Sequence, residues 1–328
     1  METMPSASGT APPASFLQVV LFNQRGLRAG WRLLIFCGML FALSYGFSQL
    51  VRYLQSLQKH TGPAVPSQSS FILPVTQGLF EFVIFLVVLL LSWIMSRIER
   101  RKVGQYGLPI AQAALARLLA SGLLLGFLLL FITLAALRGM HVFYFGSLEL
   151  HGPQILAWGL LWGFTFLGVG FFEEFLFRGY ALYTLADGIG FWPAAIIMGL
   201  VFGRAHMGNG GETYIGIVGT ILFALLASTM LRRTGSLWFP VGVHAGWDWG
   251  QSYFFGVSDS GFQAPGHLLN PHIQGPSWLS GGSVGPEGSI VTLITLVLVT
   301  VAFLAFYRER KEPALVVISA ETPGISRL

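Results

Sequence analysis

Two glutamates and an arginine lie in a stretch of this sequence that otherwise has the composition of a membrane-buried segment. Glu173, Glu174 and Arg178 belong to GFFEEFLFRGY, residues 170 to 180. Glu174 and Arg178 are four residues apart and can pair on one face of a helix, with the acid on the favourable N-terminal side. Glu173 is rotated by about 100° from Glu174 on such a helix. It cannot share this partner equally well and therefore remains available for chemistry.

Two histidines lie in later apolar segments. His206 ends the run VFGRAH, and His244 lies four residues before Asp248 in HAGWD. A carboxylate one helical turn away can accept a ring N–H of His244 and fix the imidazole's tautomer, which leaves the other nitrogen for a water, a metal or a substrate oxygen. Two imidazoles, one spare carboxylate and one oriented carboxylate are the ingredients of a hydrolytic site.

Each of these polar groups also has a structural interpretation. The Glu173 cluster could tie helices together as ion pairs, and His244 with Asp248 could form a hydrogen-bonded clasp between helices. A charge at mid-bilayer costs about 2.5 to 3.5 kcal/mol on insertion scales. Because three separate structural explanations would be needed, one functional site is the simpler account. Glu81 and Arg204 are interpreted as a pore-facing or interfacial residue and a snorkelling residue, respectively.

The elements that must position these residues are membrane-spanning helices. The chain of 328 residues is 54% hydrophobic and 10% charged, with a mean hydropathy of +0.68, whereas soluble domains are about 25% charged. The sequence predicts an all-α, polytopic membrane bundle of about eight transmembrane helices, in the apolar segments 33–51, 71–96, 117–137, 154–186, 190–206, 214–231, 238–255 and 289–307. Segment 154–186 is expected to be one helix of about 30 residues, which places Glu173 near its middle. His206 then reaches a comparable depth only if the helix 190–206 is tilted or starts low in the membrane.

Basic residues beside these segments predict the topology. They form the clusters Arg25, Arg28 and Arg32; Arg97, Arg100, Arg101 and Lys102; Arg232 and Arg233; and Arg308, Arg310 and Lys311. All four clusters fall on one side if eight spans alternate, so the positive-inside rule places both termini in the cytoplasm. We expect a multi-pass integral protein of a bacterial inner membrane. The net charge of +5 resides in these short clusters rather than on one polar face, which argues against nucleic acid as a partner.

The sequence predicts one transmembrane domain with flanking tails and one long loop. The expected parts are a cytoplasmic N-terminal tail at 1–32, the transmembrane domain at 33–312 with a catalytic core at about 155–255, a Gly/Pro-rich outer loop at 258–288 and a C-terminal tail at 313–328. The segment 258–288 is predicted to be either irregular or a re-entrant element. Cys37 is the single cysteine, so an intrachain disulfide and a thiolate metal cluster are excluded.

Three ordered motifs resemble those of a known family. They are EEFLFR with Glu173, Glu174 and Arg178, FGRAH with Phe202 and His206, and HAGWD with His244 and Asp248. In this order they resemble the EExxxR, FxxxH and HxxxN/D motifs of the CPBP family, the intramembrane CAAX-processing and bacteriocin-processing (Abi) proteases that include the type II CAAX prenyl endopeptidases. The resemblance covers about residues 155 to 255 and implies an eight-helix intramembrane endopeptidase whose site opens toward the cytosol.

The resemblance also implies roles for individual residues. Glu173 corresponds to the water-activating glutamate of the family, and His206 and His244 correspond to its two motif histidines. The prenyl endopeptidases carry Asn where this chain carries Asp248. An ionised Asp cannot donate a hydrogen bond to an oxyanion as Asn can, so Asp248 is expected to orient His244 or to help hold a metal.

We therefore predict an intramembrane endopeptidase that hydrolyses a peptide bond of a membrane-anchored or prenylated protein or peptide at the bilayer. Its predicted catalytic residues are Glu173, Glu174, His206, His244 and Asp248, supported by Arg178 and Phe202. A zinc ion held by His206, His244, Glu173 and Asp248 is chemically reasonable. No HExxH helix is present, however, and the sequence leaves the metal and the oligomeric state open.

Two other classes of protein would use the same polar residues. An ion- or proton-coupled transporter could employ the acids and histidines as a relay, although the sequence has no visible repeat or paired broken helices. A catalytically silent membrane scaffold or immunity protein is the third alternative. Retention of the full polar set argues against this last interpretation.

Overall fold

The structure is a computed structural model of the 328-residue chain. It describes residues 15–23, 26–58, 71–110 and 114–307. The C-terminal tail expected at 313–328, residues 1–14 of the expected N-terminal tail, and the basic residues Arg25, Arg308, Arg310 and Lys311 lie outside the described residues.

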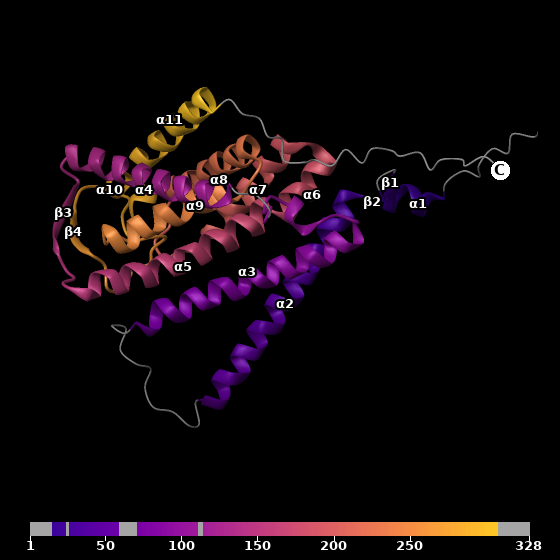
Figure 1. The fold of residues 1–328 in the computed structure, drawn as a ribbon, viewed down its shortest axis with the longest axis horizontal. Coiled ribbons are helices and arrows are strands. Elements are labelled where there is room, and N and C mark those ends of the chain that lie inside the picture. The colour runs from indigo at the N-terminus through magenta and orange to yellow at the C-terminus, as the bar shows by residue number, and fades with distance from the viewer. Residues whose placement is uncertain (1–14, 24–25, 59–70, 111–113, 308–328) are drawn as a thin grey trace, which may run out of the picture.

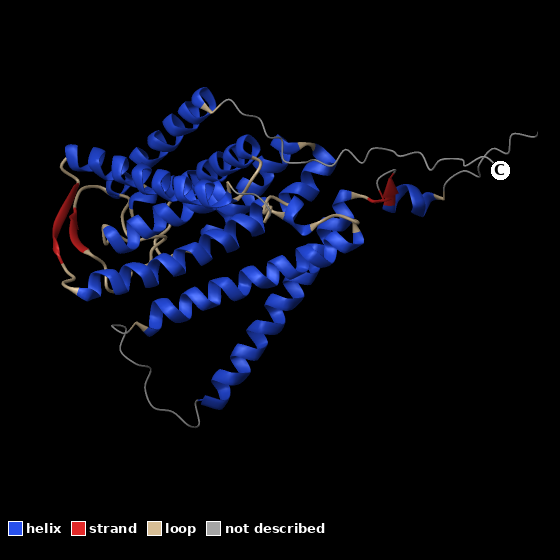
Figure 2. Ribbon diagram, viewed as in Figure 1, coloured by secondary structure: helices blue, strands red, loops and turns tan. Residues whose placement is uncertain are grey.

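The described residues form a bundle of helices with two very small sheets (Figures 1 and 2). The helices are α1 (Phe16–Leu21), α2 (Ala29–Gln58), α3 (Ile72–Ile98), α4 (Leu115–Gly139), α5 (Pro153–Arg178), α6 (Tyr180–Ile189), α7 (Phe191–His206), α8 (Tyr214–Thr234), α9 (Trp238–Asp248), α10 (Ser277–Ser280) and α11 (Ile290–Phe306). The other elements are the 3-10 helices η1 (Val103–Gln105) and η3 (Pro286–Gly288), the π-helix η2 (Trp249–Phe254) and the strands β1 (Phe22–Asn23), β2 (Gly26–Leu27), β3 (Phe143–Leu148) and β4 (Leu269–Ile273).

Length and apolar composition identify the helices that are candidates to span a membrane. Five helical stretches of the described chain are long and apolar enough to cross a bilayer: Ala29–Ser56, Ile72–Ile98, Leu115–Gly139, Pro153–Ile189 and Tyr214–Thr234. The other three predicted spans correspond to α7, to α9 continued by η2, and to α11, which are shorter. The predicted fold class, an all-α polytopic membrane bundle, is confirmed.

Helix α9 lies at the centre of the bundle. It packs against α4 on one side and α5 on the other, while α3 covers the outer face of α5 (Figure 1). Its apolar side chains belong to both of the larger core clusters, Val241 to the one that reaches α3, α5 and α6, and Val243 to the one that reaches α4, α8 and α11. Helix α2 diverges from α3 along its length and is largely exposed outside the bundle.

The close approach of α4 and α9 depends on glycine. Gly122 and Gly126 of α4 face Gly242 and Gly246 of α9, so each helix presents two glycines four residues apart. A Cβ added at any of the four would collide with backbone atoms of the facing helix. Small residues at this spacing let membrane helices approach backbone to backbone, and here they fix the position of α9.

The single long helix predicted for residues 154–186 is interrupted. The structure has α5 ending at Arg178 and α6 beginning at Tyr180, with Gly179 between them at φ −84° and ψ −125°. A Cβ at position 179 would collide with the carbonyl oxygen of Phe175. Glycine therefore permits a sharp change of direction that the continuous apolar pattern does not reveal.

The segment 258–288, predicted as an irregular outer loop, contains short regular elements. Its strand β4 pairs antiparallel with β3, which follows α4, and α10 and η3 lie after β4 (Figure 2). The pairing anchors the loop at the end of the bundle where α4 ends and α5 begins.

A buried ion-pair network lies at the opposite end of the bundle. Arg32 at the start of α2 contacts Glu99 at 2.7 Å and Asp187 at 3.2 Å, and Arg101 contacts Asp187 at 2.8 Å. Tyr106 and Tyr180 donate hydrogen bonds to Glu99. The network joins α2, α3 and α6, and it gathers two of the basic clusters that the sequence predicts on one side of the membrane.

Candidate active site

The site is built on the face of α9 that points away from α4. His244 follows Gly242 by two residues, and Asp248 follows Gly246 by two residues. Two residues correspond to a rotation of about 200° around a helix, so each polar side chain points away from its glycine. The face that holds α9 in place and the face that carries polar side chains are therefore opposite. Both polar residues are buried, with 8% of His244 and 6% of Asp248 exposed.

Glu173 of α5 lies between the two predicted histidines. Its Oε2 is 3.7 Å from His244 Nε2 and 3.9 Å from His206 Nε2. These distances are too long for direct hydrogen bonds. Glu173 Oε2 is itself buried and has no hydrogen-bond partner among the described residues. A carboxylate that faces two imidazoles across such gaps can share a water with them.

Glu174 has a different environment from its neighbour. It is fully buried, and its Oε1 accepts a hydrogen bond from Arg178 Nη1 at 3.1 Å and lies 3.0 Å from His244 Nδ1. Because a carboxylate paired with arginine can only accept, Nδ1 of His244 carries the hydrogen and Nε2 faces Glu173. The predicted pairing of Glu174 with Arg178 is thus present.

The predicted partner of His244 for tautomer control is not the one found. Asp248 was expected to accept the ring N–H, but its Oδ2 lies 3.5 Å from His244 Nε2, on the same side as Glu173. Glu174, from another helix, occupies the Nδ1 side instead. The spacing of four residues brings Asp248 near the ring without aligning it with Nδ1.

His206 is oriented by its own helix. Its Nδ1 lies 2.9 Å from the carbonyl oxygen of Phe202, which can only accept, so Nε2 faces Glu173. The ring centroids of Phe202 and His206 are 4.4 Å apart. The guanidinium carbon of Arg178 lies 4.3 Å from the centroid of the Phe202 ring. Phe202 therefore separates the buried Glu174–Arg178 pair from His206, and every predicted site residue lies in one region.

A cavity of about 270 Å³ contains the polar cluster. Its walls come from α3, α5, α7, α8, α9, α11 and the loop after η2. Glu173, His206, His244 and Asp248 line it, and so does Glu81, which the sequence suggested as a pore-facing or interfacial residue. Ligand sites are commonly concave and mostly apolar, with a few convergent polar groups, and this cavity has that character.

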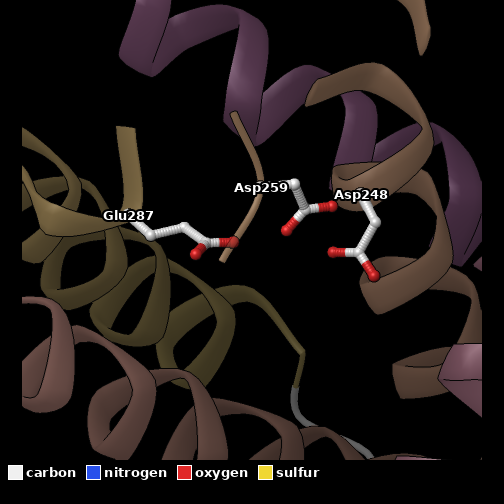
Figure 3. Close-up of side chains that lie close together, drawn as sticks. All are labelled: Asp248, Asp259 and Glu287. Carbon is white, nitrogen blue, oxygen red and sulfur yellow. The ribbon is translucent and has the colours of Figure 1, made fainter. Parts of the chain in front are cut away.

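Two residues of the cavity were missed from the sequence. Asp259 follows η2 and Glu287 lies in η3, both in the predicted outer loop, and Figure 3 shows their carboxyl groups beside that of Asp248. Potential ligand oxygens of the three lie within 4.8 Å of one another. Neither acid lies in an apolar segment, so the signal that identified the other residues was lacking.

The positions of these groups bear on the predicted zinc set. Among the described residues, one group of His, Cys, Asp and Glu side chains has its potential ligand atoms within 4.8 Å of one another. It consists of Asp248, Asp259 and Glu287 and contains no histidine. Zinc favours nitrogen and sulfur ligands, whereas three carboxylates suit harder cations. The set of His206, His244, Glu173 and Asp248 therefore does not fit a preformed zinc site.

The helical bundle thus brings a carboxylate and two oriented imidazoles together at one cavity, and these are the groups that a hydrolytic site uses. Residues 154–250 match the family model described as type II CAAX prenyl endopeptidase Rce1-like. This match covers less than half of the chain and confirms the resemblance inferred from the three motifs. No curated protein and no solved structure matches the chain.

The matched segment extends from α5 to the start of η2 and includes every predicted site residue. At the level of the family it supports a CAAX-type intramembrane endopeptidase in the lipid bilayer, acting on a peptide substrate. Asp259 and Glu287 lie beyond the matched segment.

Proposed function

We propose that the protein hydrolyses a peptide bond of a membrane-anchored or prenylated peptide with Glu173 as the general base. The observation that carries this proposal is the position of Glu173 Oε2 within 4 Å of both imidazole Nε2 atoms. A water in the cavity beside these three atoms gives its proton to Glu173 and attacks the scissile carbonyl carbon.

The histidines stabilise the charge that develops in this step. As the carbonyl oxygen becomes an oxyanion, His206 or His244 in its imidazolium form, which carries a hydrogen on Nε2 as well as on Nδ1, donates a hydrogen bond from Nε2 to it. Glu173 then returns its proton to the leaving amine, and the two peptide products separate. Glu174 touches neither water nor substrate in this scheme. It acts by holding the ring of His244, as its contact with Nδ1 supports.

Asp248 restrains the other side of His244. Its Oδ2 lies 3.5 Å from Nε2, so we assign it a positioning role rather than a bond to the oxyanion. This role accounts for an acid where the related prenyl endopeptidases have Asn. The catalytic core extends in this proposal from α5 through η2, close to the predicted range of 155–255.

The proposal is tested by cleavage with the full chain in lipid vesicles. Wild type and Glu173→Gln are incubated with membrane-anchored and prenylated peptides, and the products are identified by mass spectrometry. Cleavage by wild type alone is expected, because Gln cannot accept the proton of water. Glu149→Gln, an exposed acid outside the cavity, is the matched control. Unchanged cleavage by Glu173→Gln would eliminate the proposed base.

Chelation addresses metal assistance in the same assay. Because we assign the oxyanion to imidazole donors, a chelator is expected to leave the wild-type rate unchanged. Loss of activity that returns on addition of zinc would show that a metal takes part and would overturn this assignment.

A further inference from the structure

The wall of the cavity formed by α3 carries two polar side chains that the proposed reaction does not use. Gln77 and Glu81 lie one helical turn apart, and both line the cavity. Both are half-buried, and neither has a hydrogen bond or an ion pair with another described residue. Glu81 is the single charged residue of α3 before Arg97, and a charge inside an apolar span is costly unless it faces water or a binding partner. The Gln77–Glu81 pair therefore has unused hydrogen-bonding capacity inside the cavity.

The hydroxyl groups on the other walls of the cavity are already engaged. Those of Thr220, Ser260 and Thr292 each donate a hydrogen bond to another oxygen of the protein. The Gln77–Glu81 pair is thus available to a bound molecule in a way that these hydroxyl groups are not.

Packing against α5 fixes the position of Glu81. A Cβ added at Gly168 of α5 would lie 2.9 Å from the Cβ of Glu81, so glycine at this position admits the glutamate. A Cβ added at Gly78 would meet Phe164, and the two contacts together show that α3 and α5 run in the same direction. Glu173 follows Gly168 by five residues, about 7.5 Å along the helix axis. The reacting carboxylate therefore lies beyond Glu81, on the side away from the start of α3.

A peptide substrate in this cavity needs hydrogen-bond partners for its backbone. Attack on a carbonyl group requires an unwound segment, because the carbonyl groups inside a helix are bonded within the helix. Within a membrane, an unpaired backbone N–H or C=O is costly unless protein or water satisfies it. The unpaired polar side chains of the cavity are the groups that can do so.

The spacing of the Gln77–Glu81 pair matches an extended backbone. Its two residues are four apart on a helix, which is a rise of about 6 Å. In an extended peptide the backbone N–H and C=O groups of every second residue point to the same side, and these residues are about 6.7 Å apart. The Gln77 amide can donate and accept, whereas the Glu81 carboxylate accepts only. Two peptide residues, two positions apart, can therefore bond to the pair at once.

We propose that Gln77 and Glu81 bind the backbone of the substrate in an extended conformation beside the scissile bond. Gln77 bonds to the N–H and C=O of one substrate residue, and Glu81 accepts the N–H of the residue two positions nearer to the scissile bond. Because Glu173 lies about 7.5 Å further along α5, that second residue is about two positions from the cleaved bond. This inference rests on the proposed function, since it names the conformation in which the substrate is held.

Ester substitution tests the backbone contacts one at a time. The probes are farnesylated fluorescent peptides in which one amide is replaced by an ester, which removes the N–H and keeps the side chain. Their affinity is measured with the full-length Glu173→Gln protein in vesicles, so no turnover is needed, and binding to protein-free vesicles is subtracted. Esters at two positions, two residues apart, are expected to bind about 10-fold more weakly, because each loses a hydrogen bond to the protein.

Substitutions in α3 assign each position to a side chain. In the Glu173→Gln background, Glu81→Leu is expected to bind the all-amide peptide about 10-fold more weakly and to lose the ester effect at one position only. Gln77→Leu should do the same at the other position. Glu81→Gln keeps an acceptor oxygen and should retain the ester effect. Glu149→Gln is the control, and melting temperatures identify any variant that fails to fold; if Glu81→Leu is unfolded, Gln77→Leu decides the question.

Two results would overturn the binding pair. One is equal affinity of ester and amide peptides at every position, or no binding of any peptide. The other is an ester effect that survives both leucine substitutions. Cleavage by wild type without an ester effect would leave the proposed function intact and refute backbone binding by α3. An ester effect that depends on Glu81, with no cleavage by wild type, would support the binding pair and contradict the proposed function.

Discussion

Adjacent glutamates in this protein have separate tasks because a helix turns them to different partners. Glu174 faces Arg178 and His244 Nδ1, whereas Glu173 faces the cavity. The sequence predicted this division from the spacing of four residues between Glu174 and Arg178. It could not predict that Glu174, rather than Asp248, holds His244, since contacts between helices depend on packing that spacing within one helix does not specify.

Removal of the buried pair is expected to destabilise the fold. Glu174→Ala leaves Arg178 as an uncompensated charge that is 1% exposed, and breaking such a pair costs about 3 to 5 kcal/mol. Thermal or denaturant unfolding in mild detergent measures the loss. Glu173→Gln, which removes no hydrogen bond of the described protein, is the matched comparison. Equal stability of Glu174→Ala and wild type would contradict the structural role.

The loop acids predict a pH dependence. Burial raises the pKa of Asp259, and burial together with the charge of Asp259 raises the pKa of Glu287 well above its ordinary value. As the pH rises above about 4.3, the unfolded chain ionises Glu287 before the folded protein does, so this residue's contribution to stability declines. The melting temperature of wild type should fall more between pH 4.5 and about 7 than that of Glu287→Gln. Parallel curves would argue against the raised pKa.

At the scale of elements, α9 combines two functions on two faces. Its glycines admit α4, and its polar residues face the cavity. The sequence predicted the helical segments and the polar spacing, and the motif of two glycines four apart is visible in both GLLLG and GVHAG. That motif predicts close helix contact but not which helices pair. The break at Gly179 was not predicted, because the apolar pattern continues across it.

The glycine contact makes a specific prediction about α4. Gly126→Ala places a methyl group against the backbone of Val243, so α9 must move and carry His244 with it. Overpacking of this kind costs about 1 to 3 kcal/mol. We expect a lower melting temperature and reduced cleavage.

Gly139→Ala at the open end of α4, where nothing lies within 4 Å of the added methyl, is the control. If both substitutions have the same small effect, the α4–α9 contact does not position the site.

At the scale of the whole molecule, the membrane side predicted by the basic residues must be compared with the side on which the cavity opens. The ion-pair network brings Arg32 and Arg101 to one end, and the loop that lines the cavity is anchored toward the other. If the basic end faces the cytoplasm, as the charge clusters predict, the loop lines the cavity from the outer side of the membrane. The cytosolic opening implied by the family resemblance then requires a path that avoids the loop. Apolar composition predicts spans, but not how a loop folds back onto them.

Topology can be measured with introduced cysteines. In a Cys37→Ser background, cysteine is placed at exposed Trp278 in the loop or at exposed Lys102 beside α3. By the positive-inside rule, a membrane-impermeant maleimide should label position 278 in intact cells and position 102 only after permeabilisation. Labelling of both positions from the same side would contradict the predicted topology.

The central claim is that Glu173 and the two histidines act on one water as a unit. The most direct test is a double-mutant cycle in which kcat is measured for wild type, Glu173→Gln, His206→Asn and the double variant on one cleaved peptide. Each single substitution should reduce kcat by about 10²- to 10⁴-fold. The double variant should be about as slow as the slower single variant, because groups that act together are non-additive. Losses that multiply, or a single variant that retains wild-type kcat, would contradict the account.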